Sequence, residues 1–282
     1  MNVLVIGSGG YWGSKLVDHL ESLIPGRIFR CDPSKGHPEL GYTNYTEMLA
    51  GIDAIDAVVI ATPSTTHYEI TKLCLNANKH VLVEKPMTLD YAQACELVEL
   101  AESKKLTLMV DDTFMYTNFM LYAARRFPNS TGIRTYPSAS LNLYWTGKRY
   151  GNAPESVLWT YGPHPVSVAL AMVHEQPTRV YASGNETRLE IDLDFFGTTA
   201  HICLDTNSLA RKRHLFMHEW QHVRFVDFMS PNAMMYEHRD PLTNMLRAFL
   251  RRAESKSEPW IDYHSLEVVR VLEEIEKSCK SH

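Results

Sequence analysis

The first 110 residues alternate short apolar runs with helical patterns, and this alternation limits the fold more than any other feature of the sequence. Each run has the length of a buried strand, and most are followed by a segment with apolar residues three and four apart. The runs are Val3–Ile6, Arg27–Asp32, Ala57–Pro63, Val81–Val83 and Leu106–Val110. Strands that alternate with helices at this spacing predict an α/β fold with a doubly wound parallel sheet.

A glycine-rich turn closes the first strand and opens the first helix. Its residues are Gly7, Ser8, Gly9, Gly10, Tyr11 and Trp12, followed by Gly13. Glycines let the backbone approach a pyrophosphate, and a helix N-terminus offers free N–H groups, so this context fits a dinucleotide-binding turn. The spacing departs from a strict G-x-G-x-x-G because position 12 is Trp. An ordinary strand-to-helix turn is the alternative.

The second apolar run ends in Asp32, about 25 residues after the first glycine of the turn. An acid at this place accepts hydrogen bonds from ribose hydroxyls, and its charge repels a 2′-phosphate. The sequence therefore favours NAD as cofactor, although Lys35 lies close enough to leave NADP open. The alternative is an Asp that forms a turn before Pro33.

Residues that can contact a ligand also lie at the carboxyl ends of the third and fourth runs. In an open parallel sheet, ligands bind outside the carboxyl ends of the strands. Thr62 and Pro63 are expected there after one strand, and Glu84 and Lys85 after the next. A partly desolvated Lys amine can transfer protons near neutral pH, which makes Lys85 a candidate for chemistry. The alternative is a surface ion pair that ends a strand.

The segment after Pro63 predicts a helix, in which Thr66 and Glu69 have the spacing of a capping box. His67 lies in the first turn of this helix. It either faces the cofactor or covers the turn, and the sequence leaves both open.

The second half of the chain has a different pattern. A helix is predicted over Phe119–Phe127, and two amphipathic helices over Pro241–Ala253 and Tyr263–Cys279. Between them, strands are predicted at Ile133–Trp145, Val180–Ser183, Arg188–Phe196, Thr198–Leu204, Lys212–Glu219 and Val223–Phe228, with hairpin turns at 195–198 and 205–208. The chain is therefore expected to divide into a dinucleotide-binding domain (residues 1–115) and an α+β domain with a largely antiparallel open sheet (residues 116–282).

Two polar clusters of the second half have open interpretations. Lys148 and Arg149 lie in a glycine-flanked loop and either meet an anionic substrate group or form solvated surface. His218 and His222 would lie one turn apart on a helix, but their segment has a strand pattern, so no metal site is predicted.

Composition excludes several classes of partner. The net charge of -5 gives no basic surface for nucleic acid. Five scattered cysteines without a CxxC pair indicate reduced thiols and a cytoplasmic protein. The chain starts directly in a strand, which is not typical of a signal peptide, and no apolar run is long enough for a membrane span.

Three segments of the first half resemble the Gfo/Idh/MocA family of oxidoreductases. They are the turn that ends in Tyr11-Trp12-Gly13, Ala61-Thr62-Pro63 with His67, and His80–Pro86; Leu108–Tyr116 is similar to the strand that leaves that family's first domain. The resemblance implies a Rossmann-type first domain, a nicotinamide cofactor and a small polar substrate. It further implies Lys85 near both the nicotinamide and the reacting carbon, Asp112 toward the substrate, and a homodimer or higher oligomer formed through the second sheet.

Trp159–Ser167 resembles the family's helix over the substrate, in which an Asp and a His lie one turn apart and point at one hydroxyl. His164 matches and suits general acid/base work. This sequence has Thr160 where the family has the Asp, and Pro165 follows the His. Tyr161 is expected to supply a proton in place of the missing Asp. The expected reaction is hydride transfer with Lys85 and His164 moving the proton of a hydroxyl, ketone or imine. A catalytically impaired NAD(H) sensor or partner-binding protein is the alternative.

Overall fold

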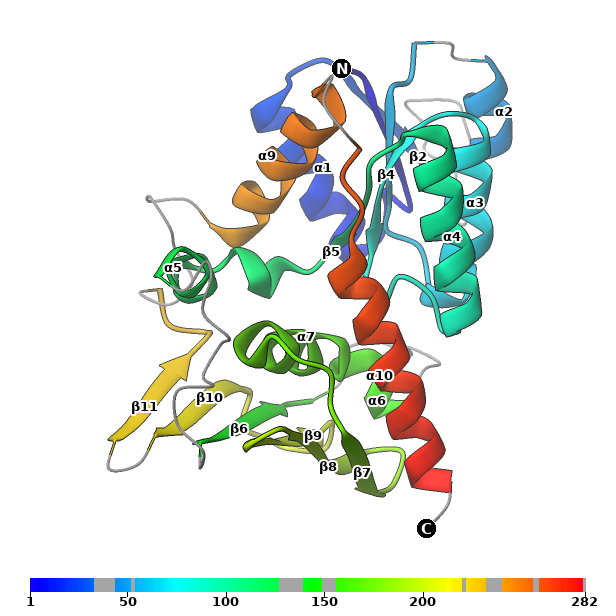
Figure 1. The fold of residues 1–282 in the computed structure, drawn as a ribbon. Coiled ribbons are helices and arrows are strands. Elements are labelled where there is room, and N and C mark those ends of the chain that lie inside the picture. Colours follow the sequence, from blue (N-terminus) through cyan, green and yellow to red (C-terminus); the bar gives the residue numbers. More distant parts are fainter. Residues whose placement is uncertain are drawn as a thin grey trace. The chain divides into compact units, whose positions relative to one another are not determined.

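The computed structural model describes residues 1–32, 44–51, 54–126, 139–148, 156–219, 222–231, 240–255 and 259–280 (Figure 1). The chain forms two compact units. The first comprises residues 1–112 and 242–266, and the second comprises residues 113–241 and 267–282. The predicted domain boundary, between residues 115 and 116, lies close to the boundary between the two units, which falls between residues 112 and 113. The prediction differs in that it assigns residues 242–266 to the second domain.

The sheet of the first unit is parallel throughout, with strand order β2-β1-β3-β4-β5. Its strands are β1 (Val3–Ile6), β2 (Ile28–Cys31), β3 (Ala57–Ile60), β4 (His80–Glu84) and β5 (Leu108–Asp111). Every residue of β1, β3 and β5 is buried, as in parallel sheets that helices cover on both faces. The predicted doubly wound parallel sheet is confirmed.

Helices lie on both faces of this sheet (Figure 1). They are α1 (Tyr11–Leu23) and α9 (Pro241–Glu254) on one face, and α2 (Tyr45–Gly51), α3 (His67–Asn76) and α4 (Tyr91–Lys104) on the other. The apolar residues Leu16, Val17 and Leu20 form the buried stripe of α1. At α4, the Asp90 carboxylate caps the helix by accepting the Gln93 N–H at 2.8 Å.

The capping box predicted at the start of α3 is not formed. A short 3₁₀ turn, η1 (Ser64–Thr66), precedes the helix, so Thr66 already has a helical backbone (φ -105, ψ -8). Its hydroxyl donates instead toward Pro63 O at 2.7 Å and Thr62 Oγ1 at 2.8 Å.

Specific bonds hold residues 242–266 in the first unit. The Asp262 carboxylate accepts the Val110 N–H of β5 at 3.1 Å, and Trp260 O accepts the Leu108 N–H at 3.1 Å. The Arg252 guanidinium lies 3.7 Å from the Trp260 ring centre. The two hydrogen bonds join segments 152 residues apart, which no local pattern reveals.

The second unit contains a six-stranded sheet with the order β11-β10-β6-β9-β8-β7. Its strands are β6 (Ala139–Thr146), β7 (Arg179–Gly184), β8 (Arg188–Phe195), β9 (Thr198–Asp205), β10 (Lys212–Glu219) and β11 (His222–Asp227). All pairings are antiparallel except β6 with β9, which confirms a largely antiparallel sheet. The turn at 195–198 joins the hairpin β8–β9 as predicted. The hairpin predicted at 205–208 is wrong, because β6 lies between β9 and β10.

Helices α6 (Val157–Tyr161) and α7 (Pro163–Val173) pack on the inner face of this sheet, where alternate residues of β8 and β9 are buried. The unit also contains η2 (Thr113–Tyr116) and α5 (Asn118–Arg126). Among the described residues, no helix combines the length and apolar character that crossing a membrane requires.

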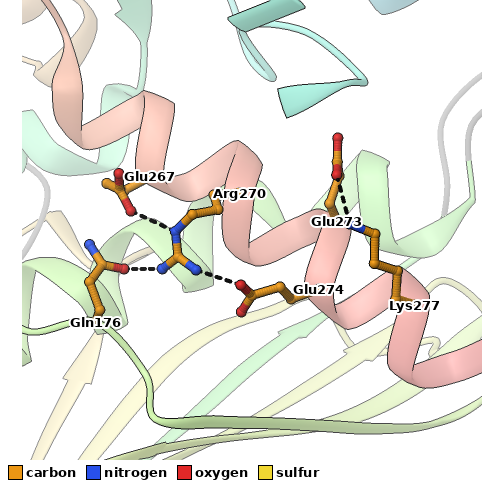
Figure 2. A network of polar contacts seen from close by, with 6 residues as sticks. All are labelled: Gln176, Glu267, Arg270, Glu273, Glu274 and Lys277. Atoms are coloured by element: carbon orange, nitrogen blue, oxygen red, sulfur yellow. Dashed lines mark hydrogen bonds and ion pairs between the residues drawn. The ribbon is translucent and has the colours of Figure 1, made fainter. Parts of the chain in front are cut away.

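The terminal helix α10 (Tyr263–Lys280) carries a polar network in its second-unit part (Figure 2). Arg270 donates to Glu267 at 2.8 Å, to Glu274 at 2.5 Å and to Gln176, while Lys277 pairs with Glu273 at 3.2 Å. The Gln176 contact ties the helix to the segment after α7. Further bonds from Trp159 to Glu276 and from the Ala182 N–H to Ser278, both at 3.0 Å, attach the same part of α10 to the second unit.

Candidate active site

The glycine turn is shaped by two positions that only glycine can occupy. Gly7 has φ +86, and a Cβ there would lie 2.5 Å from Ala61 O at the end of β3. A Cβ on Gly13 would lie 2.0 Å from Gly7 O, so α1 can pack on the turn only through a glycine. The helix-packing glycine is therefore at position 13, one residue later than in the strict motif.

Asp32 holds the glycine turn from the end of β2. Its side chain is 4% exposed, and its Oδ2 accepts the Gly9 N–H at 2.9 Å. Cys31 O, the last carbonyl of β2, accepts the Ser8 hydroxyl at 3.3 Å and the N–H groups of Gly7 and Ser8 at 2.8 and 3.2 Å, so several hydrogen bonds join the turn to the end of β2. Pro33 and Lys35 lie outside the described residues, and the ribose contact of Asp32 stays a prediction.

The aromatic residues of the turn take different positions. Tyr11 is 78% exposed, and its ring and hydroxyl face the Lys15 amine, with 2.8 Å between Nζ and the hydroxyl. Trp12 points inward, and its indole Nε1 donates to Asp111 Oδ2 of β5 at 2.7 Å.

His67 is buried and joins two of the predicted loops. Its Nδ1 lies 2.8 Å from Pro86 O, and its Nε2 lies 2.9 Å from Thr62 O. The ring therefore links the chain after β3 to the chain after β4. This arrangement gives His67 a positioning role for both loops; a direct cofactor contact stays a prediction.

Glu84 ends β4 and Lys85 follows it, as expected, and a further acid lies on the neighbouring strand. Glu84 lies in register with Asp111, the last residue of β5. Glu84 Oε2 also accepts the Lys85 backbone N–H at 2.9 Å. Burial, and next the charge of Asp111, raise the pKa of Glu84 well above its usual value, against the opposing effect of the Lys85 ammonium.

The predicted substrate helix is present in the second unit. Thr160 lies in α6 and His164 in α7, and helical backbone continues between them through Gly162 (φ -60, ψ -36). Pro163 and Pro165 occupy the first turn of α7, where a missing N–H costs no helical hydrogen bond. The His164 ring packs edge-on against Phe114, 4.6 Å between ring centres.

Tyr161 is engaged by the loop after β6. Its hydroxyl lies 3.1 Å from Gly147 O and 3.2 Å from Lys148 O, and the Arg213 guanidinium lies 4.8 Å from its ring centre. Arg213 is 8% exposed, and its Nη1 donates to Thr146 O at 2.7 Å. These contacts favour a structural role for Tyr161 over the proton-donor role predicted for it.

The structure thus assembles two groups of predicted residues, one in each unit. The first unit holds the glycine turn with Asp32, the Thr62–His67–Pro86 link, and Glu84 with Lys85; Asp112 is its buried last residue before the second unit. The second unit holds Thr160, Tyr161 and His164. Arg149 lies outside the described residues.

Sequence reasoning missed Asp111 and Arg213 as members of these groups. For Asp111 a signal existed: it ends the strand next to the one that ends in Glu84. For Arg213 there was none, since its burial depends on the pairing of β10 with β6. In the described part of the chain, no group of three or more His, Cys, Asp or Glu side chains could hold a metal ion.

Comparison with known proteins agrees with this architecture. Residues 30–112 match the family model GFO_IDH_MocA, described as an oxidoreductase family with an NAD-binding Rossmann fold. Most of the first unit is thus similar to the NAD-binding part of the Gfo/Idh/MocA oxidoreductases. The resemblance noted in the sequence is confirmed, and so is the Rossmann-type first domain.

Two curated relatives illustrate the extent of the similarity. It is 52% identical over 71 residues to an oxidoreductase of Schizosaccharomyces pombe, covering 25% of this chain and 19% of the relative. It is 27% identical over 215 residues to scyllo-inositol 2-dehydrogenase (NADP(+)) of Bacillus subtilis, covering 72% and 58%. The chain thus matches less than two thirds of the length of both.

A solved structure shows the same fold over nearly the whole length. UDP-N-acetylglucosamine 3-dehydrogenase from Acidithiobacillus ferrooxidans superimposes with a TM-score of 0.84, covering 100% of this chain and 98% of that one at 19% identity.

Proposed function

We propose that this protein is an NAD(P)-dependent oxidoreductase that transfers a hydride between nicotinamide and a small polar substrate, a sugar-like alcohol or ketone, or an imine. One observation carries the proposal: the glycine turn after β1 meets the chain after β3 at the point where the strand order reverses. Ligands of open α/β sheets bind at such a switch point. Lys85 follows β4, the next strand of the same sheet.

The residues of the first unit fit a dinucleotide. The turn has no Cβ at the two closest backbone approaches, and the N-terminus of α1 follows it directly. The residues proposed to hold the cofactor are Gly7, Ser8, Gly9, Gly10, Tyr11, Trp12, Asp32, Thr62, Pro63, His67, Glu84 and Lys85. The buried carboxylate of Asp32 supports NAD as the preferred form, although the Bacillus subtilis relative is named for NADP(+).

The proposed chemistry divides between cofactor and chain. When bound, the nicotinamide ring supplies the acceptor or donor of the hydride. In alcohol oxidation the C–H and O–H bonds break and the carbonyl forms, while the Lys85 amine or the His164 imidazole takes the hydroxyl proton. In reduction the same groups return the proton. The substrate is proposed to contact Lys85, Asp112, Arg149, Thr160 and His164.

The names of relatives support a polyhydroxylated substrate. One is a scyllo-inositol dehydrogenase, and one neighbouring structure is a UDP-N-acetylglucosamine dehydrogenase. The test is to incubate the protein with NAD or NADP and a panel of inositols, sugars and nucleotide sugars, and to follow the absorbance of the reduced nicotinamide. Turnover of one panel member that requires both Lys85 and His164 supports the proposal. Turnover that survives loss of either side chain contradicts the role given to it.

A second candidate function rests on Thr160. A threonine cannot act as a carboxylate base next to His164, which favours an NAD(H)-binding sensor or partner-binding protein of the same fold. Saturable NADH binding without oxidation by any keto-sugar or imine of the panel would support the sensor.

We further propose a homodimer formed through the outer face of the second-unit sheet, in the cytoplasm. Large apolar side chains are exposed on these strands, among them Val223 at 59% and Phe225 at 52%. The mass in solution, measured by light scattering, tests the dimer: Phe225→Glu should shift it to that of a monomer.

A further inference from the structure

One lysine of α1 reaches back over the start of the helix. Side chains of a helix lean toward its N-terminus, so Lys15 meets the residue four positions earlier. Its Nζ lies 2.8 Å from the Tyr11 hydroxyl, 4.3 Å from the centre of the Tyr11 ring and 5.5 Å from that of the Trp12 ring. The ammonium is therefore held at the first turn of α1, directly after the glycine turn.

This ammonium has no carboxylate partner in the described part of the chain. The polar and ring contacts of Lys15 are those with the two aromatic side chains of the preceding turn. The first turn of α1 contains no acid. Farther along the helix, Glu21 pairs with Arg30, and Asp18 is exposed and forms no ion pair with Lys15. The positive charge of Lys15 is thus available to a ligand.

The position of this charge favours an anionic ligand. The N-terminus of an α-helix carries a partial positive charge on its unpaired N–H groups, so a cation beside it is unfavourable. At the start of α1 the N-cap is Gly10, and no side chain accepts a hydrogen bond from these groups as a cap. An anion bound at this end would accept the free N–H groups and pair with the Lys15 ammonium at once.

Two carboxylates that bond to the same turn make a cation more important there. Asp32 accepts the Gly9 N–H at 2.9 Å, and Asp111 accepts the Trp12 indole N–H at 2.7 Å. A pyrophosphate at this turn carries two negative charges, which both carboxylates repel. Lys15 supplies a positive charge at the same place, and this charge offsets the repulsion.

We propose that the Lys15 ammonium binds the pyrophosphate of the dinucleotide, and that Tyr11 is a positioning residue that holds the ammonium at the start of α1. This inference rests on the proposed cofactor site and adds Lys15 to the residues that hold the cofactor. It gives Tyr11 a role that acts through Lys15. That role accounts for a large aromatic side chain that is 78% exposed beside the turn.

Lys15→Met tests the pyrophosphate contact, because it removes the charge and nearly keeps the length of the side chain. The affinity for NADH, measured by fluorescence titration, should fall about tenfold or more, since a hydrogen bond to a charged group is lost. The affinity should also depend less on salt concentration than in the wild type, because one exposed ion pair is missing. Equal affinities of wild type and Lys15→Met would overturn the inference.

A matched control removes a lysine at the other end of the strands. Lys104 lies in the last turn of α4, before β5 begins, and its Nζ donates to Asn76 O at 3.3 Å and to Asn78 Oδ1 at 3.0 Å. Lys104→Met changes the net charge as Lys15→Met does, and it should keep the NADH affinity and salt dependence of the wild type. Equal losses in the two variants would overturn the contact, because net charge alone would then explain both.

Fragments of the cofactor locate the contact on the ligand. ADP-ribose contains the pyrophosphate without the nicotinamide, and adenosine contains no phosphate. In competition with NADH, Lys15→Met should weaken ADP-ribose as much as it weakens NADH and should leave the affinity for adenosine unchanged. An equal loss for adenosine would show a damaged turn and overturn the pyrophosphate contact.

A double-mutant cycle tests the positioning role of Tyr11. Tyr11→Leu should weaken NADH binding in the wild-type background and have little further effect in Lys15→Met, since the ring acts on the cofactor through the ammonium. Tyr11→Phe keeps the ring and should retain more of the NADH affinity than Tyr11→Leu. Free-energy losses of Tyr11→Leu and Lys15→Met that add in the double variant would overturn the positioning role.

None of these measurements needs turnover. NADH binding that depends on Lys15, without turnover of any substrate, supports the inference and counts against the proposed hydride transfer alone. A wild-type protein that binds neither NADH nor ADP-ribose overturns both the inference and the proposed function.

Discussion

The indole of Trp12 donates to the carboxylate of Asp111 at 2.7 Å, across 99 residues of sequence. This bond connects the first turn of α1, directly after the glycine turn, to the carboxyl end of β5. It is the only hydrogen bond described for the Trp12 indole, and it reaches the acid that lies in register with Glu84. The glycine turn is therefore bonded to the strand next to the one that Lys85 follows.

Trp12→Phe tests this connection. Loss of one hydrogen bond to a carboxylate should lower the unfolding free energy by about 1–3 kcal/mol and weaken NADH binding, because the bond holds the start of α1 against β5. Trp159→Phe is a matched control, since Trp159 Nε1 donates to Glu276 at 3.0 Å in the second unit. It should cost similar stability in urea unfolding without changing NADH affinity. NADH affinities that fall equally in both variants contradict the connection.

Gly13→Ala tests the shape of the glycine turn. The added Cβ would lie 2.0 Å from Gly7 O, so α1 must move away from the turn. We expect a loss of about 1–3 kcal/mol in unfolding free energy together with much weaker NADH binding by fluorescence. Gly26→Ala is the control: its φ is +72, but nothing lies within 4 Å of its Cβ position. That variant should lose stability and keep NADH affinity; equal affinities in both variants would argue against the turn as the cofactor site.

Asp32→Asn tests the cofactor preference. The asparagine oxygen can still accept the Gly9 N–H, so the turn is kept while the negative charge is removed. The ratio of kcat/KM with NADP to that with NAD should rise by about tenfold or more, because the acid no longer binds the ribose hydroxyls or repels a 2′-phosphate. Asp18→Asn, on the exposed side of α1, should leave the ratio unchanged. An unchanged ratio in Asp32→Asn would show that Asp32 does not select the cofactor.

The thiols of Cys31 and Cys74 should be inert in the folded protein. Burial, and next the charge of Asp32, raise the pKa of Cys31 to about 11; burial raises that of Cys74 to about 12. The reactive thiolate is therefore scarce at pH 8 and increases only as the pH approaches these values. Labelling with a thiol reagent followed by peptide mass spectrometry should modify both cysteines in urea but neither in buffer. Fast labelling of Cys74 in buffer would contradict its burial.

The sequence was sufficient for the parts of the fold that local patterns encode. The all-apolar runs of β1 and β3 indicated strands buried on both faces, and the glycine turn with Asp32 indicated a dinucleotide site. In each case the residues that form the feature lie within one strand–turn–helix segment or at the end of the next strand.

The parts that could not be predicted depend on contacts between distant segments. The pairing of β6 with β9 and β10 joins strands some 60 to 80 residues apart, and the attachment of Asp262 to β5 joins segments 152 residues apart. Asp111 was overlooked because the partnership of two acids follows from strand register, which is set by the whole sheet. The capping box predicted at Thr66 is not formed, because a 3₁₀ turn gives Thr66 a helical backbone in which its side chain does not cap the helix.

The most direct test of the central claim is kcat/KM of Lys85→Met with the substrate found in the panel. Lys79→Met is the matched control: Lys79 precedes β4, at its opposite end, and its amine donates to Ile55 O at 2.7 Å. The account predicts a loss of about 10²-fold or more in Lys85→Met, and near wild-type turnover and NADH affinity in Lys79→Met. Wild-type turnover in Lys85→Met would contradict it.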